Sequence, residues 1–300
     1  MFHGIMNVYK EAGFTSHDVV AKLRGICKQK KIGHTGTLDP DAVGVLPVCL
    51  GNGTKLCDML TDKTKEYIAE FQLGIVTDTQ DISGQVLQKL PVTVTPEEVR
   101  KMMHAFQGEL QQVPPMYSAL KVNGKKLYEL AREGKEVERK PRAIIIFELE
   151  LLEEKHPRYQ IRVKCSKGTY IRTLCHDIGQ ALGCGAVMTS LTRTRVGEFT
   201  IENAYRLSEI EQMAGENRLS QIITPVEDMF LDLCRIETIH GAGMALHNGN
   251  QLPVTVVKTE KQKDWLDGEQ CRTYDESGKF CGIYEYQEER RLFTPVKMFL

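Results

Sequence analysis

The sequence predicts an α+β protein with a largely antiparallel sheet and a small β-rich domain at its C-terminus. Helix and strand patterns are mixed over the first 230 residues, and after about residue 230 only short β-like runs remain. The 300 residues, 41% of them hydrophobic, are enough to bury one large core and a smaller one. We therefore expect one domain over residues 1–230 and a second over residues 231–300.

Two helices are marked by capping residues. One is expected over residues 16–27, where Thr15 or Ser16 can act as the cap and apolar residues fall on one face. The other begins at "TPEEVRKMMHAF", in which Thr95 is the N-cap, proline takes the first helical position and a glutamate completes a capping box. Further helices are expected near residues 55–60 and 170–182.

Alternating apolar residues predict the strands. In "EYIAEFQLG", Tyr67 and every second residue after it share one face. Other strands are expected at residues 143–152, at residues 159–165 and in "TRTRVGEFTI". Residues 114–142 differ, because they begin with a proline pair and are rich in basic side chains; they predict a protruding, partly helical insertion.

The formal net charge of −1 hides an asymmetry. Acidic residues are in excess over residues 200–300, and basic residues are in excess before them. Basic side chains cluster without any acidic residue at residues 22–31 and 155–172. Such clusters are typical of solvated faces, and beside the motifs described below they also favour a polyanionic partner.

The nine cysteines form no CxxC pair and show no zinc-like spacing. No apolar run reaches the length of a membrane span, and the N-terminal "MFHGIMNVYKEAG" lacks a signal-peptide pattern. We therefore expect reduced thiols in a cytoplasmic protein that does not associate with membranes.

The stretch "GHTGTLDPDAVGVLP" sets Asp39 in a loop rich in turn-forming residues. Asp-Pro is a common turn dipeptide, so the aspartate could simply cap the turn. The apolar run over residues 43–50 would instead anchor the loop in the core and hold the carboxylate rigidly, as a functional site requires. Asp39 is therefore the first candidate for catalysis.

This loop resembles the motif around the catalytic aspartate of the TruB family, the tRNA pseudouridine-55 synthases. The resemblance continues in family order through "GFTSHDVVAKLR", "KEYIAEFQLGIVTDTQDISG", "QVPPMYSALKVNGKKLYELAREG", "CSKGTYIRTLCHDIGQALGCGA" and "LTRTRVGEF". It spans most of residues 4–199 and is weaker in the C-terminal domain, which is similar to the family's PUA-type RNA-binding module. One departure, Lys10-Glu11 where the family usually has Lys-Pro, concerns the local turn.

The resemblance implies a reaction that breaks the C1′–N1 bond of a uridine, rotates the held uracil and joins C1′ to C5. The reaction needs no redox change, metal or nucleotide cofactor, in agreement with a sequence that carries no P-loop, GxGxxG or zinc signature. One carboxylate is a sufficient catalyst. It can add to the sugar or base, or take the C2′ proton to give a glycal, and the sequence leaves both routes open.

Three catalytic residues follow from the resemblance. Asp39 takes the role of the carboxylate. Tyr67, which could also be an ordinary sheet-face aromatic, would stack on the flipped uracil with its hydroxyl near C5 to assist proton removal. Arg172, which could be an ordinary first-turn side chain, would pair with Asp39, keep it ionised and fix its geometry, with a phosphate or the substrate as alternative partners.

The substrate-binding residues begin with His34, which could be a general base, a loop side chain or a wedge. Because uridine 55 is buried in the folded T-loop and must be extracted, we favour a wedge that stacks in the vacated space. Leu191 would pack against the base, although a core leucine has the same pattern. The remaining candidates, within or near basic stretches expected to contact T-arm phosphates, are Tyr170, Lys55, Lys121, Lys125 and Lys126.

The implied partner is the T-arm of tRNA, without a membrane or a protein partner. A tRNA-binding or folding protein without catalysis is an alternative, but the intact set of Asp39, Tyr67 and Arg172 argues against it. A guide-RNA-dependent synthase is another, but the extensions usual in such chains are missing. A glycoside hydrolase would need a second carboxylate, for which only Asp41 offers itself. A stand-alone bacterial enzyme is favoured.

Overall fold

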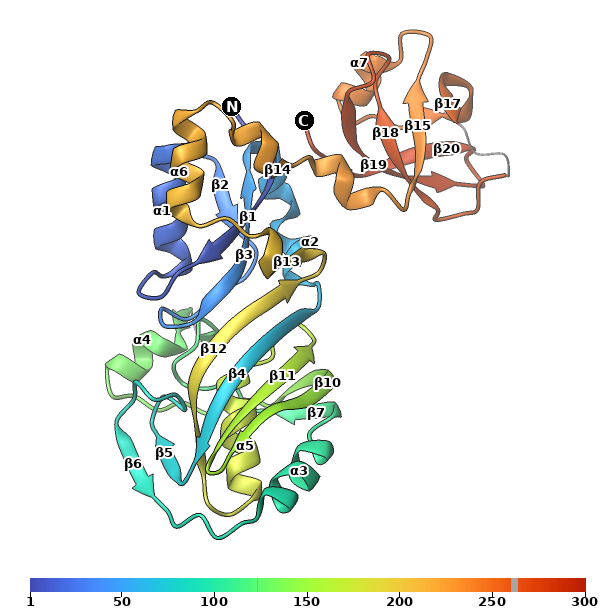
Figure 1. The fold of residues 1–300 in the computed structure, drawn as a ribbon. Coiled ribbons are helices and arrows are strands. Elements are labelled where there is room, and N and C mark those ends of the chain that lie inside the picture. The colour runs from blue at the N-terminus through green and yellow to red at the C-terminus, as the bar shows by residue number, and fades with distance from the viewer. Residues whose placement is uncertain (123, 260–263) are drawn as a thin grey trace.

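The computed structural model, described for residues 1–122, 124–259 and 264–300, contains one large sheet flanked by helices and a second, smaller sheet. The smaller sheet stands to one side of the larger one, joined to it by the chain after β14 (Ile223–Thr224) (Figure 1). The α+β class expected from the sequence is therefore confirmed.

The large sheet has ten strands and is antiparallel except at its centre, where β3 (Val43–Leu50) runs parallel to β12 (Ala186–Val196). β2 (Ile32–His34) pairs with β3, and β13 (Phe199–Thr200) pairs with β12. The order along the main path is β14, β1 (Gly4–Lys10), β3, β12, β4 (Lys65–Leu73), β11 (Arg158–Cys165), β10 (Arg142–Lys155) and β7 (Gly108–Gln112).

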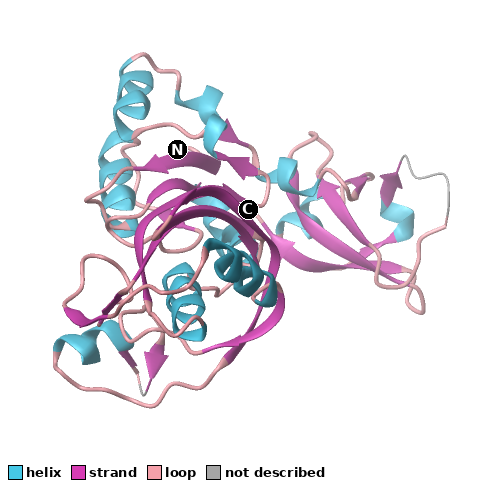
Figure 2. Ribbon diagram, turned by 60° about the horizontal axis from the view of Figure 1, so that its bottom comes forward, coloured by secondary structure: helices cyan, strands magenta, loops and turns pink. Residues whose placement is uncertain are grey.

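Helices pack on the two halves of this sheet. On the first half, α1 (Ser16–Ile26) and α6 (Leu207–Gly215) share a core with β1 and β3. On the second half, the strands curve around α3 (Pro96–Ala105) and α5 (Ile171–Ala181), which share a core with β4 and β11 (Figure 2). The strand β12 belongs to both halves, so the line where they meet runs between β3 and β4.

The capping residues expected from the sequence are confirmed. Thr15 accepts a hydrogen bond from the backbone of Asp18, and Thr95 does the same for Glu98; both helices have the reciprocal bonds of a capping box. The segment expected to be helical near residues 55–60 forms a 3₁₀ turn, η1 (Gly51–Leu56), followed by α2 (Cys57–Thr61).

Two hairpins lie outside the large sheet. One joins β5 (Ile75–Thr77) to β6 (Val86–Lys89). The other joins β8 (Lys121–Val122) to β9 (Lys125–Lys126), and α4 (Leu127–Arg132) follows it directly. The expectation of a partly helical segment within residues 114–142 is thus confirmed.

The second sheet has six strands in the order β16 (Leu252–Pro253), β20 (Leu292–Met298), β19 (Phe280–Gln287), β18 (Gln270–Tyr274), β15 (Cys234–Thr238) and β17 (Val257–Thr259). A short helix, α7 (Gly243–His247), corrects the expectation that only β-like runs occur here; five residues are too few to show a helical period. Short 3₁₀ turns complete the chain: η2 (Ile201–Asn203), η3 (Leu219–Ile222), η4 (Val226–Phe230) and η5 (Val254–Val256).

The two sheets share an apolar core. Ile283 and Phe299 of the C-terminal part pack in one cluster with Ile5 and Val45 of the large sheet. All nine cysteines are free thiols. Among the described residues, no helix is long and apolar enough to cross a membrane.

Candidate active site

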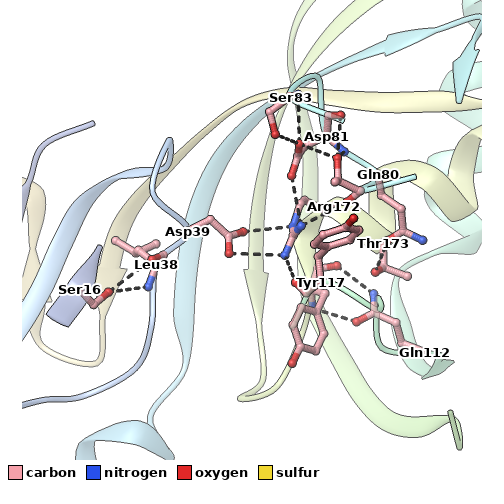
Figure 3. Close-up of polar contacts among 12 residues, drawn as sticks. Ser16, Leu38, Asp39, Gln80, Asp81, Ser83, Gln112, Tyr117, Arg172 and Thr173 are labelled. Atoms are coloured by element: carbon pink, nitrogen blue, oxygen red, sulfur yellow. Dashed lines mark hydrogen bonds and ion pairs between the residues drawn. The ribbon is translucent and has the colours of Figure 1, made fainter. Parts of the chain in front are cut away.

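The loop that carries Asp39 is tied to its surroundings at several points. The backbone N–H of Leu38 donates to Ser16 Oγ at 2.9 Å (Figure 3). The buried ammonium of Lys10 donates to the carbonyl of Pro40 at 2.9 Å, and the N–H of Gly13 donates to the same carbonyl at 3.0 Å. Because the loop is bound on both sides of Asp39, its carboxylate has little freedom to move.

The departure from the family pattern at Lys10-Glu11 does not disturb this arrangement. Lys10 Nζ also donates to the carbonyl of Phe14 at 2.6 Å, which closes the turn that follows β1. Glu11 stands where the family usually has proline, and its carboxylate pairs with Arg206 at 2.8 Å. The turn is therefore formed without the proline.

Arg172, the second residue of α5, places its guanidinium beside the carboxylate of Asp39. Its Nε lies 3.1 Å from Asp39 Oδ2, and one terminal nitrogen lies 3.4 Å from Oδ1 (Figure 3). The same nitrogen donates to the carbonyl of Tyr117 at 2.9 Å, and the other donates to the carbonyl of Thr79 at 3.2 Å and to Asp81 Oδ2 at 3.1 Å. The two terminal nitrogens thus make four hydrogen bonds and Nε faces Asp39, so the contacts of the guanidinium are within the protein.

Asp81 is a site residue that the sequence reasoning missed. Its Oδ2 accepts from Arg172, while its Oδ1 accepts from the hydroxyls of Thr79 at 2.8 Å and Ser83 at 2.6 Å. The available signal was its position in "KEYIAEFQLGIVTDTQDISG", the stretch that also contains Tyr67. Because both of its oxygens accept hydrogen bonds, Asp81 holds Arg172 in place. It is not the free second carboxylic acid that a glycoside hydrolase needs. Asp41, the residue that the sequence offered for that role, is exposed.

The carboxylate of Asp39 is open to a ligand on one side, since its side chain is 42% exposed. Burial by the surrounding protein atoms raises its pKa above that of an ordinary aspartate. The charge of Arg172 acts in the opposite sense, and the carboxylate of Asp81 raises the pKa again. The site therefore holds a carboxylate that is more basic than usual yet kept ionised by an arginine.

Tyr67 lies on β4, two strands from the loop, and its side chain belongs to the core cluster that includes Leu38. Leu191 of β12 lies opposite Ala69, two residues further along β4, and packs against the same cluster. The structure thus brings Asp39, Arg172, Tyr67 and Leu191 to the line where the two halves of the large sheet meet.

His34 ends β2 and enters the loop of Asp39. Burial is the main cause that lowers the pKa of its imidazole, and the nearby charge of Arg193 lowers it further. Its Nδ1 is buried and has no hydrogen-bond partner among the described residues. A neutral ring without a polar partner at Nδ1 suits stacking better than proton transfer.

Tyr170 is the N-cap residue of α5, and its backbone is clamped by Gln112. The amide of Gln112 accepts from the N–H of Tyr170 at 2.8 Å and donates to its carbonyl at 3.0 Å (Figure 3). This clamp fixes the first turn of α5, on which Arg172 lies.

The lysines expected to bind substrate have different surroundings. Lys121 is exposed on the β8–β9 hairpin, Lys125 pairs with Glu133 at 3.4 Å, and Lys126 lies over the ring of Tyr128. Lys55 instead donates to the carbonyl of Leu300 at 3.0 Å, at the junction with the C-terminal sheet. Lys121 and Lys125 are thus exposed on the hairpin, whereas the contact of Lys55 is structural.

The basic stretch over residues 155–172 is largely neutralised. Arg162 pairs with Glu150, and Lys164 pairs with Glu148 at 2.7 Å, each across the β10–β11 ladder. Lys167 pairs with Asp62 at 2.8 Å. A stretch expected to contact phosphates is therefore engaged with carboxylates of the protein, and its structural role is the better supported one.

One group of described residues brings three potential metal ligands within 4.8 Å of one another, namely His247, Asp275 and Cys281 of the C-terminal sheet region. Asp275 is already bonded, since its Oδ1 accepts from the backbone N–H groups of Ser277 and Lys279 and its Oδ2 contacts His247 at 2.8 Å. Burial raises the pKa of the Cys281 thiol to about 11, which disfavours the thiolate that a metal would bind. We read this group as a structural turn.

Family models and relatives agree on the class of this site. The model "TruB family pseudouridylate synthase (N terminal domain)" matches residues 24–171, and "tRNA pseudouridylate synthase B C-terminal domain" matches residues 172–231. The chain belongs to the TruB family. Neither model extends beyond residue 231, so the six-stranded sheet lies outside the residues that they match.

The curated TruB relatives are similar along the whole chain. A protein of Lachnoclostridium phytofermentans named tRNA pseudouridine synthase B is 53% identical over 99% of this chain and 100% of its own length. One of Clostridium tetani with the same name is 42% identical over 96% of each chain. Among solved structures, a Cbf5–Nop10–Gar1 complex gives a TM-score of 0.72 at 27% identity, covering 99% of this chain and 85% of that chain.

Proposed function

We propose that this TruB-family protein is a stand-alone tRNA pseudouridine synthase that converts uridine 55 of the T-loop to pseudouridine. The observation that carries the proposal is the Asp39 carboxylate, held by Arg172 through two oxygens and open on its other side, in a chain that matches curated tRNA pseudouridine synthases over their full length.

The proposed reaction uses the geometry directly. Asp39, kept ionised by Arg172, attacks the target nucleotide or removes its C2′ proton, and the C1′–N1 bond breaks. The uracil turns while it is held between Tyr67 and Leu191, and C5 then bonds to C1′. Tyr67 assists removal of the C5 proton, and N1 takes up a proton from water, so that uridine and pseudouridine have the same composition.

The substrate must first be extracted from the folded T-loop. We propose that His34, at the end of β2, stacks where the flipped nucleotide has left, and that the hairpin lysines Lys121, Lys125 and Lys126 contact phosphates. Tyr170 and Leu191 line the same region as Arg172. A tRNA-modifying protein of this kind would act in the cytoplasm.

The guide-RNA-dependent alternative has one observation in its favour, the likeness to Cbf5 in complexes with other proteins. The identity to a curated relative named tRNA pseudouridine synthase B is higher, 53% against 27%, and supports the proposal of an enzyme that needs no partner. The C-terminal sheet, which the family resemblance likens to a PUA-type module, would then add a second RNA contact.

The deciding experiment incubates the purified protein with an unmodified tRNA transcript, without a cofactor, guide RNA or second protein, and maps pseudouridine by position. Modification confined to position 55 is the expected result. Modification elsewhere would revise the site, modification only with a guide RNA would favour the Cbf5-like alternative, and tight binding without modification would favour a folding protein.

A further inference from the structure

Arg193 of β12 is a buried cation without a carboxylate partner among the described residues. It is only 1% exposed, and its side chain is the largest fully buried one in the part of the chain that the structure describes. Its Nε donates to the carbonyl of Val45 at 2.7 Å, and a terminal nitrogen donates to the carbonyl of Gly36 at 3.3 Å. An arginine cannot lose its proton inside a protein, so this charge is retained at a desolvation cost.

The neighbours of Arg193 do not lower that cost by charge. Lys65 and His34 lie close enough for the arginine to lower their pKa values, so its charge opposes the protonation of both side chains. A neutral, well-packed side chain would be easier to accommodate at such a position. The retention of a guanidinium there indicates that it has a task besides packing.

The position of Arg193 in the sheet places its side chain next to Tyr67. In the antiparallel β4–β12 ladder, Arg193 is directly opposite Tyr67. Side chains of directly opposed residues project from the same face and meet. The charge of the guanidinium lowers the pKa of the Tyr67 hydroxyl, in keeping with this position. The same side chain therefore lies beside the tyrosine and hydrogen-bonds to the carbonyls of Gly36 and Val45, on either side of Asp39.

We propose that Arg193 is a positioning residue that acts through the hydroxyl of Tyr67 and supports removal of the C5 proton after C5 has bonded to C1′. The inference rests on the proposed function, which gives Tyr67 the C5 proton. Arg193 orients the phenol oxygen toward the base and stabilises negative charge on it.

The proposed step is balanced as follows. The C5–H bond breaks, and its proton passes to the phenolate oxygen of Tyr67. The electron pair of that bond forms the C5–C6 double bond, the pair displaced from the C6–N1 double bond goes to N1, and N1 takes a proton from water. Tyr67 then returns its proton to water. Burial raises the pKa of Tyr67 and opposes the phenolate, whereas the charge of Arg193 lowers that pKa.

The test uses a tRNA transcript with deuterium at C5 of its uridines and measures single-turnover formation of pseudouridine. Arg193→Lys keeps the charge but loses the planar fork. We expect a loss on the order of tenfold, the size of one hydrogen bond to a charged group. The isotope effect at C5 should rise, because proton removal becomes more rate-limiting. Arg195→Lys, on the same strand but exposed, is the matched control and should behave as wild type.

A double-mutant cycle separates this role from a structural one. In a Tyr67→Phe background, Arg193→Lys should have little further effect on the rate. An equal loss in both backgrounds, or an unchanged isotope effect, would overturn the inference, because a general packing defect acts without the tyrosine hydroxyl.

A second measurement does not depend on activity. The absorbance titration of Tyr67, obtained as the difference between wild type and Tyr67→Phe, should shift to higher pH in Arg193→Met. An unchanged titration would exclude the contact between Arg193 and Tyr67. If the wild type formed no pseudouridine, the proposed function would fail, whereas the titration would still decide whether the arginine acts on the tyrosine.

Discussion

The guanidinium of Arg172 meets the carboxylate of Asp39 side by side, with Nε 3.1 Å from Oδ2 and a terminal nitrogen 3.4 Å from Oδ1. A second carboxylate, Asp81, holds the same guanidinium from the other side at 3.1 Å. The arginine is thus fixed by one aspartate and in turn fixes another, which remains open to a ligand. Four predictions build on this site and its surroundings.

Asp39→Asn should abolish pseudouridine formation and leave tRNA binding within a few fold of wild type. The amide occupies the same space but can act neither as a base nor as a nucleophile. Because burial raises the folded-state pKa of Asp39, the folded protein holds this proton more tightly than the unfolded chain does, and the ionised group costs stability at neutral pH. The melting temperature of Asp39→Asn at pH 7 should therefore not fall. A variant that unfolds yet keeps its activity per folded molecule would indicate a purely structural aspartate.

The pH dependence of the single-turnover rate should follow Asp39. The rate needs the ionised carboxylate, so it should fall as the pH drops through a pKa above that of an ordinary aspartate. Removing the charge in Arg172→Met should move this acidic limb to higher pH. Asp81→Asn should move the acidic limb to lower pH, because the carboxylate of Asp81 raises the pKa of Asp39. The same substitution should also lower the maximal rate, since Arg172 is then held less firmly. An acidic limb that is the same in all three proteins would contradict the assignment.

The helix caps and the Asp39–Arg172 pair show which features of the structure could be predicted from the sequence. The helix caps at Thr15 and Thr95 are local signals, and both were predictable because each bond spans only three residues. Asp39 and Arg172 came from the family resemblance, since their contact joins positions 133 residues apart. No local pattern shows such a pair.

The burial of Arg193 could not be predicted from the alternation of residues along its strand. Strict alternation along "LTRTRVGEF" would place Arg193 and Arg195 on the same face of the strand. A register shift in the β4–β12 ladder lies between them, so that Arg193 is buried and Arg195 is exposed. The bulge depends on the partner strand and is not visible in β12 alone.

The basic residues after position 155 illustrate the same limit. Their carboxylate partners lie on β10, directly opposite Lys164 and Arg162 in the ladder. Cross-strand partners are fixed by register, which the sequence alone did not supply, so an apparent phosphate-binding stretch proved to be paired within the sheet.

The difference between basic residues paired across the large sheet and those on the β8–β9 hairpin leads to the third prediction. Replacing Lys121, Lys125 and Lys126 together by glutamine should weaken tRNA binding and flatten its dependence on salt. Each phosphate contact contributes about 0.7 to 0.9 to the slope of log affinity against log salt, so three contacts should reduce the slope by roughly 2 to 3. The matched control replaces Arg162 and Lys164, which pair with glutamates, and should leave the slope unchanged. Equal slopes in both sets would show that the β8–β9 hairpin does not touch the RNA backbone.

The last prediction concerns His34 as a wedge. His34→Ala should lose stacking on the RNA, which is worth roughly 1–3 kcal/mol per stacked base. This corresponds to a loss on the order of ten- to a hundredfold in catalytic efficiency, at about 1.4 kcal/mol per tenfold. His34→Phe should recover part of the loss, because any planar ring can fill the space. The buried Nδ1 without a partner and the lowered pKa of the imidazole both favour this role over proton transfer.

The substrate decides between the two roles of His34. On a short T-loop fragment whose uridine is already unstacked, a wedge has less to do, so His34→Ala should approach wild type in single-turnover rate. A general base is needed whatever the shape of the RNA, and phenylalanine cannot replace it. Equal failure of His34→Ala and His34→Phe on the loosened fragment would therefore show that the imidazole acts on a proton, and recovery of both variants on that fragment would show that it acts on the fold of the RNA.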